Sequence, residues 1–137
     1  MSLGPRIMQR LLDQAGRRRD KAAQAAQAGA RAWTKARQTA DMLNQYEQEQ
    51  YARRRQDGAR ASDSEALRLN QGFHLKLRDA RKQQDRSVAD LTEVTRQTHA
   101  ALIRHQTRVR ALEAMQARRL ATEPPATADL SSAKPTS

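Results

Sequence analysis

The chain has 137 residues and a mean hydropathy of −0.97, and only 3% of its residues are aromatic. A chain this polar lacks the apolar surface for a wide globular core, so helices that share a narrow apolar seam are expected instead. The formal net charge of +11 favours an acidic partner, without deciding among nucleic acid, an anionic membrane and an acidic protein surface.

The first predicted helix covers residues about 6–57. Pro5 suits a first helical turn, and beyond it only Gly16 and Gly29 interrupt a long run of good helix formers. Apolar and small residues recur at three- and four-residue spacing, which predicts one face packed against a partner helix. Alanine dominates this stripe, so each turn buries little area. The stripe consists of Met8, Leu11, Leu12, Ala15, Ala22, Ala25, Ala26, Gly29, Ala32, Trp33, Ala36, Ala40, Leu43 and Tyr46.

A helix stop followed by a helix start lies after this segment. Gly58 can adopt the left-handed conformation that closes a helix C-terminus, and Ser62 with Glu65 has the spacing of a capping box. Two helices joined by a short connection, here residues about 58–62, are usually antiparallel neighbours. The alternative is one continuous helix through residue 60, since a single glycine costs only about 1 kcal/mol. The agreement of the stop and start signals favours the hairpin.

The second predicted helix covers residues about 63–121 and carries larger aliphatic residues on its stripe. A fold-back near residue 60 places Ala36 near Gln84, and Met8 near Leu112, give or take one helical turn. Large residues then face small ones along most of the seam, which supports the hairpin. The stripe consists of Leu69 or Asn70, Phe73, Leu77, Ala80, Gln84, Val88, Leu91, Val94, Thr98, Ala101, Leu102, His105, Val109, Leu112 and Met115.

These features predict an all-α fold, a long antiparallel two-helix coiled-coil hairpin over residues 1–121. The proline-containing segment 122–137 is expected to form a disordered C-terminal tail. No apolar run approaches the roughly 20 residues that span a bilayer. The N-terminus lacks a signal-peptide core and the chain has no cysteine, so a cytoplasmic protein is expected.

Groups that could carry catalysis are scarce. The histidines His74, His99 and His105 lack the spacing of metal-ligand pairs, and the chain has no glycine-rich phosphate loop and no cysteine nucleophile. A narrow coiled coil also offers no cleft that could exclude water. We therefore expect neither enzymatic activity nor a cofactor or metal. The basic clusters 17–19 and 53–55 lack any known nucleic-acid-binding signature, so specific nucleic-acid binding is not expected either.

Both tyrosines and the only phenylalanine, Tyr46, Tyr51 and Phe73, fall on either side of the predicted connection. One interpretation is that they close the seam, and the other is that they form an outward docking patch, since aromatic residues are typical binding anchors. The pattern alone leaves both open. A narrow seam has little room for Tyr46 and Phe73 together, so we expect at least one ring edge to be exposed.

Around these aromatic residues the sequence resembles the FliJ family of flagellar export proteins and, more distantly, the YscO-type proteins of injectisomes. Gln50 stands where the family has a second tyrosine, and Tyr51 follows one place later. Thr39 stands where a glutamine is often found. The similarity is carried by Met42-Leu43-Asn44-Gln45-Tyr46, by Asn70-Gln71-Gly72-Phe73 with Leu77, Ala80 and Gln84, and by residues 109–118.

The resemblance implies a non-enzymatic, stalk-like component of flagellar type III protein export. Such a protein couples the hexameric export ATPase to the cytoplasmic domain of the export gate, and it can engage export chaperones. It associates with the cytoplasmic face of the inner membrane without inserting into it. The implied gate-binding residues are Leu43, Tyr46, Phe73, Leu77, Ala80 and Gln84. The ends at 6–21 and 104–119 are implied to contact the ATPase ring, with candidates Arg10, Arg17, Arg18, Arg108 and Arg118. The alternatives are an injectisome stalk protein and a basic coiled-coil protein that binds nucleic acid or has a structural role.

Overall fold

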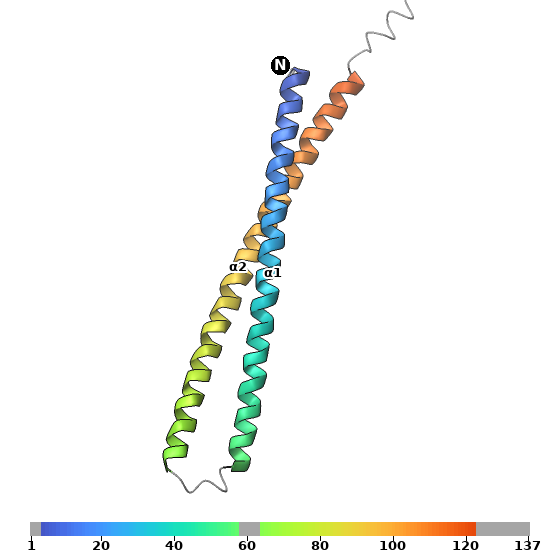
Figure 1. Cartoon of the computed structure of the whole chain (residues 1–137). Helices are drawn as coiled ribbons and strands as arrows, with labels where there is room; N and C mark the ends of the chain where they lie inside the picture. Colours follow the sequence, from blue (N-terminus) through green and yellow to red (C-terminus); the bar gives the residue numbers. More distant parts are fainter. Residues whose placement is uncertain (1–3, 58–63, 123–137) are drawn as a thin grey trace, which may run out of the picture. The chain divides into compact units, whose positions relative to one another are not determined.

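The computed structural model describes residues 4–57 and 64–122, and nearly all of them belong to two helices (Figure 1). Helix α1 is Pro5–Asp57, with 53 residues, and helix α2 is Ser64–Thr122, with 59 residues. The Met8 amide donates to the Gly4 carbonyl at 3.0 Å, so helical hydrogen bonding begins at the predicted proline turn. Gly58, Ser62 and the tail beyond Thr122 lie outside the described residues.

The predicted fold class is confirmed, because the two long helices pack against each other and the described residues contain no strand. The chain divides into two compact units. Unit 1 comprises Met1–Ala23 and Ala100–Ser137, and unit 2 comprises Gln24–His99. Neither α1 nor α2 is apolar enough over a sufficient length to cross a membrane.

Unit 1 pairs the first part of α1 with the last part of α2. Its core consists of Met8, Ala15, Val109 and Leu112, each at most 8% exposed. Met8 and Leu112, which the expected register makes neighbours, thus belong to the same core. The partly buried residues Leu11 and Leu12 pack against this core from α1.

Unit 2 pairs the second part of α1 with the first part of α2, which run side by side in opposite directions (Figure 1). Ala36 and Ala40 on α1 pack with Val88 on α2, and Leu91 packs against them. Small residues therefore face larger ones, as the sequence predicts. Because alanine projects little from the helix, the bulkier α2 residues can fill the space between the two backbones.

Three hydrogen bonds across the seam define the register of unit 2. The Gln84 side-chain amide donates to the Ala36 carbonyl at 3.0 Å, in the predicted register. The Trp33 indole N–H donates to Thr92 Oγ1 at 2.8 Å, one turn beyond Val88, which a fold-back near residue 60 places opposite Trp33. The Thr95 hydroxyl donates to the Gly29 carbonyl at 3.3 Å, one turn beyond Leu91, which the same fold-back places opposite Gly29. The pairing therefore shifts by up to one turn along the seam.

The buried faces of α1 and α2 also differ by one position from the predicted stripes, at residues 46–47 and at residues 80–81. Tyr46 is exposed and Glu47 is half-buried on α1, while on α2 Ala80 is exposed and Arg81 is half-buried. A stripe drawn at three- and four-residue steps can follow either of two adjacent positions, because the helix has 3.6 residues per turn. At both places the second of the two adjacent residues is the more buried one, Glu47 on α1 and Arg81 on α2.

Candidate functional site

The six predicted gate-binding residues all lie in unit 2, but they fall into two groups. Leu77 is buried in the seam, and Leu43 and Gln84 are half-buried. The amide of Gln84 is already used in the bond to the Ala36 carbonyl. The other three residues, Tyr46, Phe73 and Ala80, are exposed. A partner approaching this surface would therefore meet the second group first.

Tyr46 of α1 and Phe73 of α2 form an aromatic pair at the edge of the seam. Their ring centroids are 6.2 Å apart and their planes meet at 82°, an edge-to-face arrangement that aromatic pairs favour. The two residues are 42% and 43% exposed, so the expectation of an exposed edge is met by both. Met42 and Leu69 lie one turn from this pair and are 70% and 75% exposed. We call these four residues the aromatic face.

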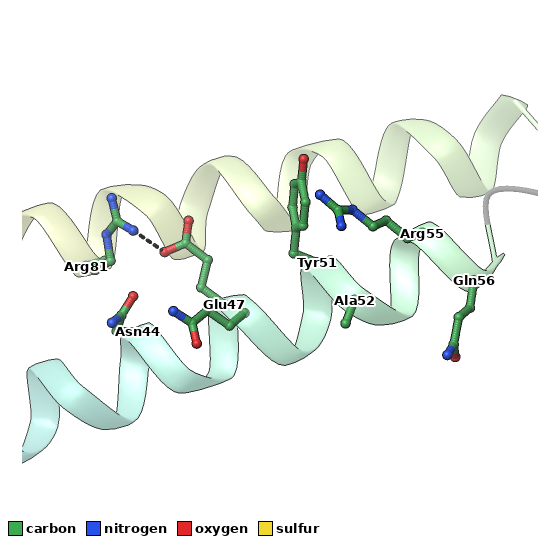
Figure 2. Close-up of a pocket in the computed structure, with 8 residues that line it drawn as sticks. Asn44, Glu47, Tyr51, Ala52, Arg55, Gln56 and Arg81 are labelled. Atoms are coloured by element: carbon green, nitrogen blue, oxygen red, sulfur yellow. Dashed lines mark ion pairs between the residues drawn. The ribbon is translucent and has the colours of Figure 1, made fainter.

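Tyr51 lies on the other side of the hairpin from the aromatic face. Successive helix positions are 100° apart, so the one-residue difference between Gln50 and Tyr51 changes the side of the helix that each occupies. Gln50 is half-buried in the seam, whereas Tyr51 projects beside α2 into a groove between the helices (Figure 2). Tyr51 therefore does not supply the second family tyrosine to the aromatic face.

The groove around Tyr51 has arginines on both of its walls. It consists of two adjoining hollows that share Glu47 and Tyr51. One is lined by Arg55 of α1 and Arg81 of α2, and the other by Arg54 of α1 and Arg78 of α2. The Arg55 guanidinium carbon lies 4.9 Å from the centroid of the Tyr51 ring, close enough for a cation–π interaction. We call Tyr51 and these four arginines the arginine groove.

An ion pair that the sequence pattern did not predict also lines the groove. Arg81 Nη1 lies 2.9 Å from Glu47 Oε2, and the two side chains are 34% and 20% exposed (Figure 2). The sequence contains a signal for this pair, because Arg81 directly follows the stripe residue Ala80 and the oppositely charged Glu47 directly follows the stripe residue Tyr46. Partial burial makes this pair more consequential to break than a surface pair, since removing one partner leaves a charge without its counterion.

The five arginines predicted to contact the ATPase ring all lie in unit 1, and all are exposed. Within the described part of the chain none of them forms an ion pair or a side-chain hydrogen bond. The neighbouring Arg19 differs, because it is half-buried and lies 3.3 Å from Asp20. The five residues are Arg10, Arg17 and Arg18 on α1 and Arg108 and Arg118 on α2.

The residues that could carry acid–base or metal chemistry lie apart from one another. Among the residues that the structure describes, no three His, Cys, Asp or Glu side chains are grouped so that they could hold a metal ion. A hydrogen bond from Arg96 lowers the pKa of Glu93, and the same bond raises the pKa of Arg96. Both side chains are on the surface of α2 and are three residues apart, so this is a local helix pair.

The family model described as "Flagellar FliJ protein" matches residues 6–125. The chain belongs to the FliJ family. It is accordingly a component of the flagellar export apparatus. Neither the curated proteins nor the solved structures include a match to the chain.

The match to the FliJ family covers both helices and the residues between them, so it includes the aromatic face, the arginine groove and the exposed arginines of unit 1. In this FliJ-family chain, seam residues and candidate partner-contact residues alternate along the same helix. Leu77 and Phe73 illustrate this, because they are one turn apart on α2 and yet only Phe73 is exposed. Family membership therefore identifies the flagellar export apparatus as the assembly to which the chain belongs. The burial of each side chain in the structure separates the residues that pack in the seam from those that a partner can contact.

Proposed function

We propose that this FliJ-family protein is a non-enzymatic, stalk-like component that couples the hexameric export ATPase to the cytoplasmic domain of the export gate. It acts at the cytoplasmic face of the inner membrane and engages export chaperones there. The observation that carries the proposal is the aromatic pair, in which one ring from each helix is held in place and left partly open to solvent.

The aromatic face supplies the gate-binding surface in this proposal. Aromatic side chains bury a large area at low entropic cost, and the contact between Tyr46 and Phe73 already restricts both rings before a partner arrives. Leu77 is buried one turn from Phe73 and, with half-buried Leu43 and Gln84, contributes to the seam that holds the two helices together. These three residues thus position the surface, while Tyr46, Phe73 and Ala80 contact the gate.

The exposed arginines of unit 1 supply the contact with the ATPase ring. They have no carboxylate partner among the described residues, so their charge is available to an acidic surface. An interaction of this kind speeds association and weakens with salt. Two distinct surfaces, one apolar and one basic, would allow the same chain to engage two partners at once.

The test of gate binding compares Tyr46→Ala and Phe73→Ala with Val94→Ala, a control residue of unit 2 that is also 43% exposed. We would measure thermal melting by circular dichroism and affinity for the purified cytoplasmic domain of the gate by calorimetry. We expect all three variants to melt near the wild type. Each aromatic variant should lose about 2 kcal/mol of binding, roughly 30-fold in Kd, and the control should lose little.

The opposite pattern would show that the aromatic residues belong to the core. Truncating a fully buried phenylalanine costs about 3 to 5 kcal/mol of stability. If Phe73→Ala and Tyr46→Ala melted far below the wild type while the folded fraction still bound the gate, the aromatic face would be a packing feature and the gate site would lie elsewhere.

A further inference from the structure

The arginine groove lies outside the surfaces assigned above to the gate and the ATPase. It is in unit 2, on the side of the hairpin that carries Tyr51 (Figure 2). The aromatic face, with Tyr46 and Phe73, lies on the other side of the seam. Tyr51 is 54% exposed, and Leu75, which lines the adjoining part of the groove, is 59% exposed. The groove therefore combines open apolar surface with a high density of basic groups.

The charges that line the groove are unbalanced. Among the described residues that line the groove, Glu47 is the only acidic one, and its carboxylate is already paired with Arg81. Arg54, Arg55 and Arg78 form no ion pair with any carboxylate whose side chain the structure describes. Three guanidinium groups on two helices thus line these two adjoining hollows without a paired carboxylate among the described side chains. Such groups bind carboxylates through paired N–H donors.

We infer that the arginine groove is a docking site for an acidic peptide segment of a partner protein, and that this segment also carries apolar side chains. Its carboxylates pair with Arg54, Arg55 and Arg78, and its apolar side chains pack on Tyr51 and Leu75. The basic side chains favour a partner segment that carries carboxylates. The exposed side chains of Tyr51 and Leu75 favour a segment that also carries apolar residues.

The geometry favours a peptide over the other common polyanions. A peptide chain can lie between two helices and contact both basic walls, while a lipid surface is broad and meets convex parts of a protein first. Single-stranded nucleic acid would stack its bases on an aromatic ring, but Arg55 already lies over one face of the Tyr51 ring. The two surfaces share no residue, so peptide binding and gate binding can be tested with separate variants.

The test uses the full-length protein and a short fluorescein-labelled peptide of alternating glutamate and leucine, with binding followed by anisotropy. Two matched peptides replace either all glutamates by glutamine or all leucines by serine. The groove variant is Arg54→Gln/Arg78→Gln. Its control, Arg31→Gln/Arg86→Gln, removes the same charge from two exposed arginines of unit 2 that lie outside the groove. Circular dichroism verifies that each variant is folded.

We expect the glutamate–leucine peptide to bind more tightly than either matched peptide. The groove variant should weaken this binding about tenfold or more, whereas the control should change it by less than about twofold. Tyr51→Ala should reduce the advantage of the leucine-containing peptide over the serine-containing one. Tyr46→Ala, on the other face, should leave peptide binding unchanged.

Three results would overturn the inference. Equal losses in the groove variant and its control would mean that net charge alone attracts the peptide. A loss in Tyr46→Ala as large as that in Tyr51→Ala would place the peptide on the aromatic face. Tighter binding to phosphatidylglycerol vesicles or to oligo-dT, abolished by Arg54→Gln/Arg78→Gln, would assign the groove to a membrane surface or to nucleic acid instead.

Discussion

Replacing Gly29 by a large residue should destabilise unit 2, because the backbone of α1 lies directly against two threonines of α2 at this point. A Cβ atom at Gly29 would lie 3.4 Å from Thr98 Oγ1 and 3.7 Å from Thr95 Oγ1. It would also lie 3.9 Å from the Thr95 Cα, which belongs to the backbone and cannot rotate away. One methyl group fits at these distances with a small adjustment, but the further carbons of leucine do not.

The expected magnitude follows from three contributions. Overpacking costs about 1 to 3 kcal/mol. Loss of the hydrogen bond from Thr95 to the Gly29 carbonyl adds about 0.5 to 1.5 kcal/mol. The better helix propensity of leucine returns roughly 0.8 kcal/mol. Gly29→Leu should therefore lower the free energy of unfolding by about 1 to 4 kcal/mol. In Gly29→Ala the propensity gain and the tight contact nearly cancel, and the change should stay within about 1 kcal/mol.

The matched control is Gly72→Leu in the same unit. A Cβ at Gly72 has nothing within 4 Å, so this variant receives the propensity gain without the steric cost. Urea unfolding can be followed by the fluorescence of Trp33, the only tryptophan, whose indole bonds to Thr92 across the seam. The two leucine variants should differ by about 2 kcal/mol or more. Thr98→Ala should recover part of the loss in Gly29→Leu by opening space.

Equal stability of Gly29→Leu and Gly72→Leu would refute this reasoning. It would mean that the helices of unit 2 separate at Gly29 without cost, and that the threonine contacts do not hold the two backbones together.

Two further predictions concern charged residues. Arg81→Ala should destabilise unit 2 more than the double variant Glu47→Gln/Arg81→Ala does, because the single change leaves the half-buried Glu47 carboxylate without its counterion. A double-mutant cycle measured by urea unfolding tests this prediction, and equal losses of stability in the two variants would contradict it. The proposed contact with the ATPase ring implies that this protein stimulates ATP hydrolysis. Replacing three exposed arginines of unit 1 by glutamine should lower that stimulation, and the stimulation that remains should depend less on salt. These arginines are Arg10, Arg17 and Arg18. The control replaces three exposed basic residues of unit 2, Arg31, Lys35 and Arg86, and ATPase rates reduced equally by both triple variants would contradict the assignment.

The two helices and their antiparallel pairing were predictable from sequence because both depend on local and repeating signals. Alanine, arginine, glutamine and leucine favour helix individually, and the three- and four-residue spacing marks one face of each helix. The complementary sizes of the two stripes also carried the approximate register, as the bond from Gln84 to the Ala36 carbonyl shows. The resemblance around Tyr46 and Phe73 led to the family that the chain belongs to.

Only the tertiary structure decided which side of the seam each residue near residues 58–63 occupies. The helical repeat of 3.6 lies between steps of three and four, so a stripe read from sequence leaves an uncertainty of one position, and one position is 100° around the helix. That step separates exposed Tyr46 from half-buried Glu47, and half-buried Gln50 from Tyr51 in the groove. The packing of the partner helix resolves it: Arg81 and Glu47 both turn inward and pair across the seam, and the aromatic pair lies at its edge.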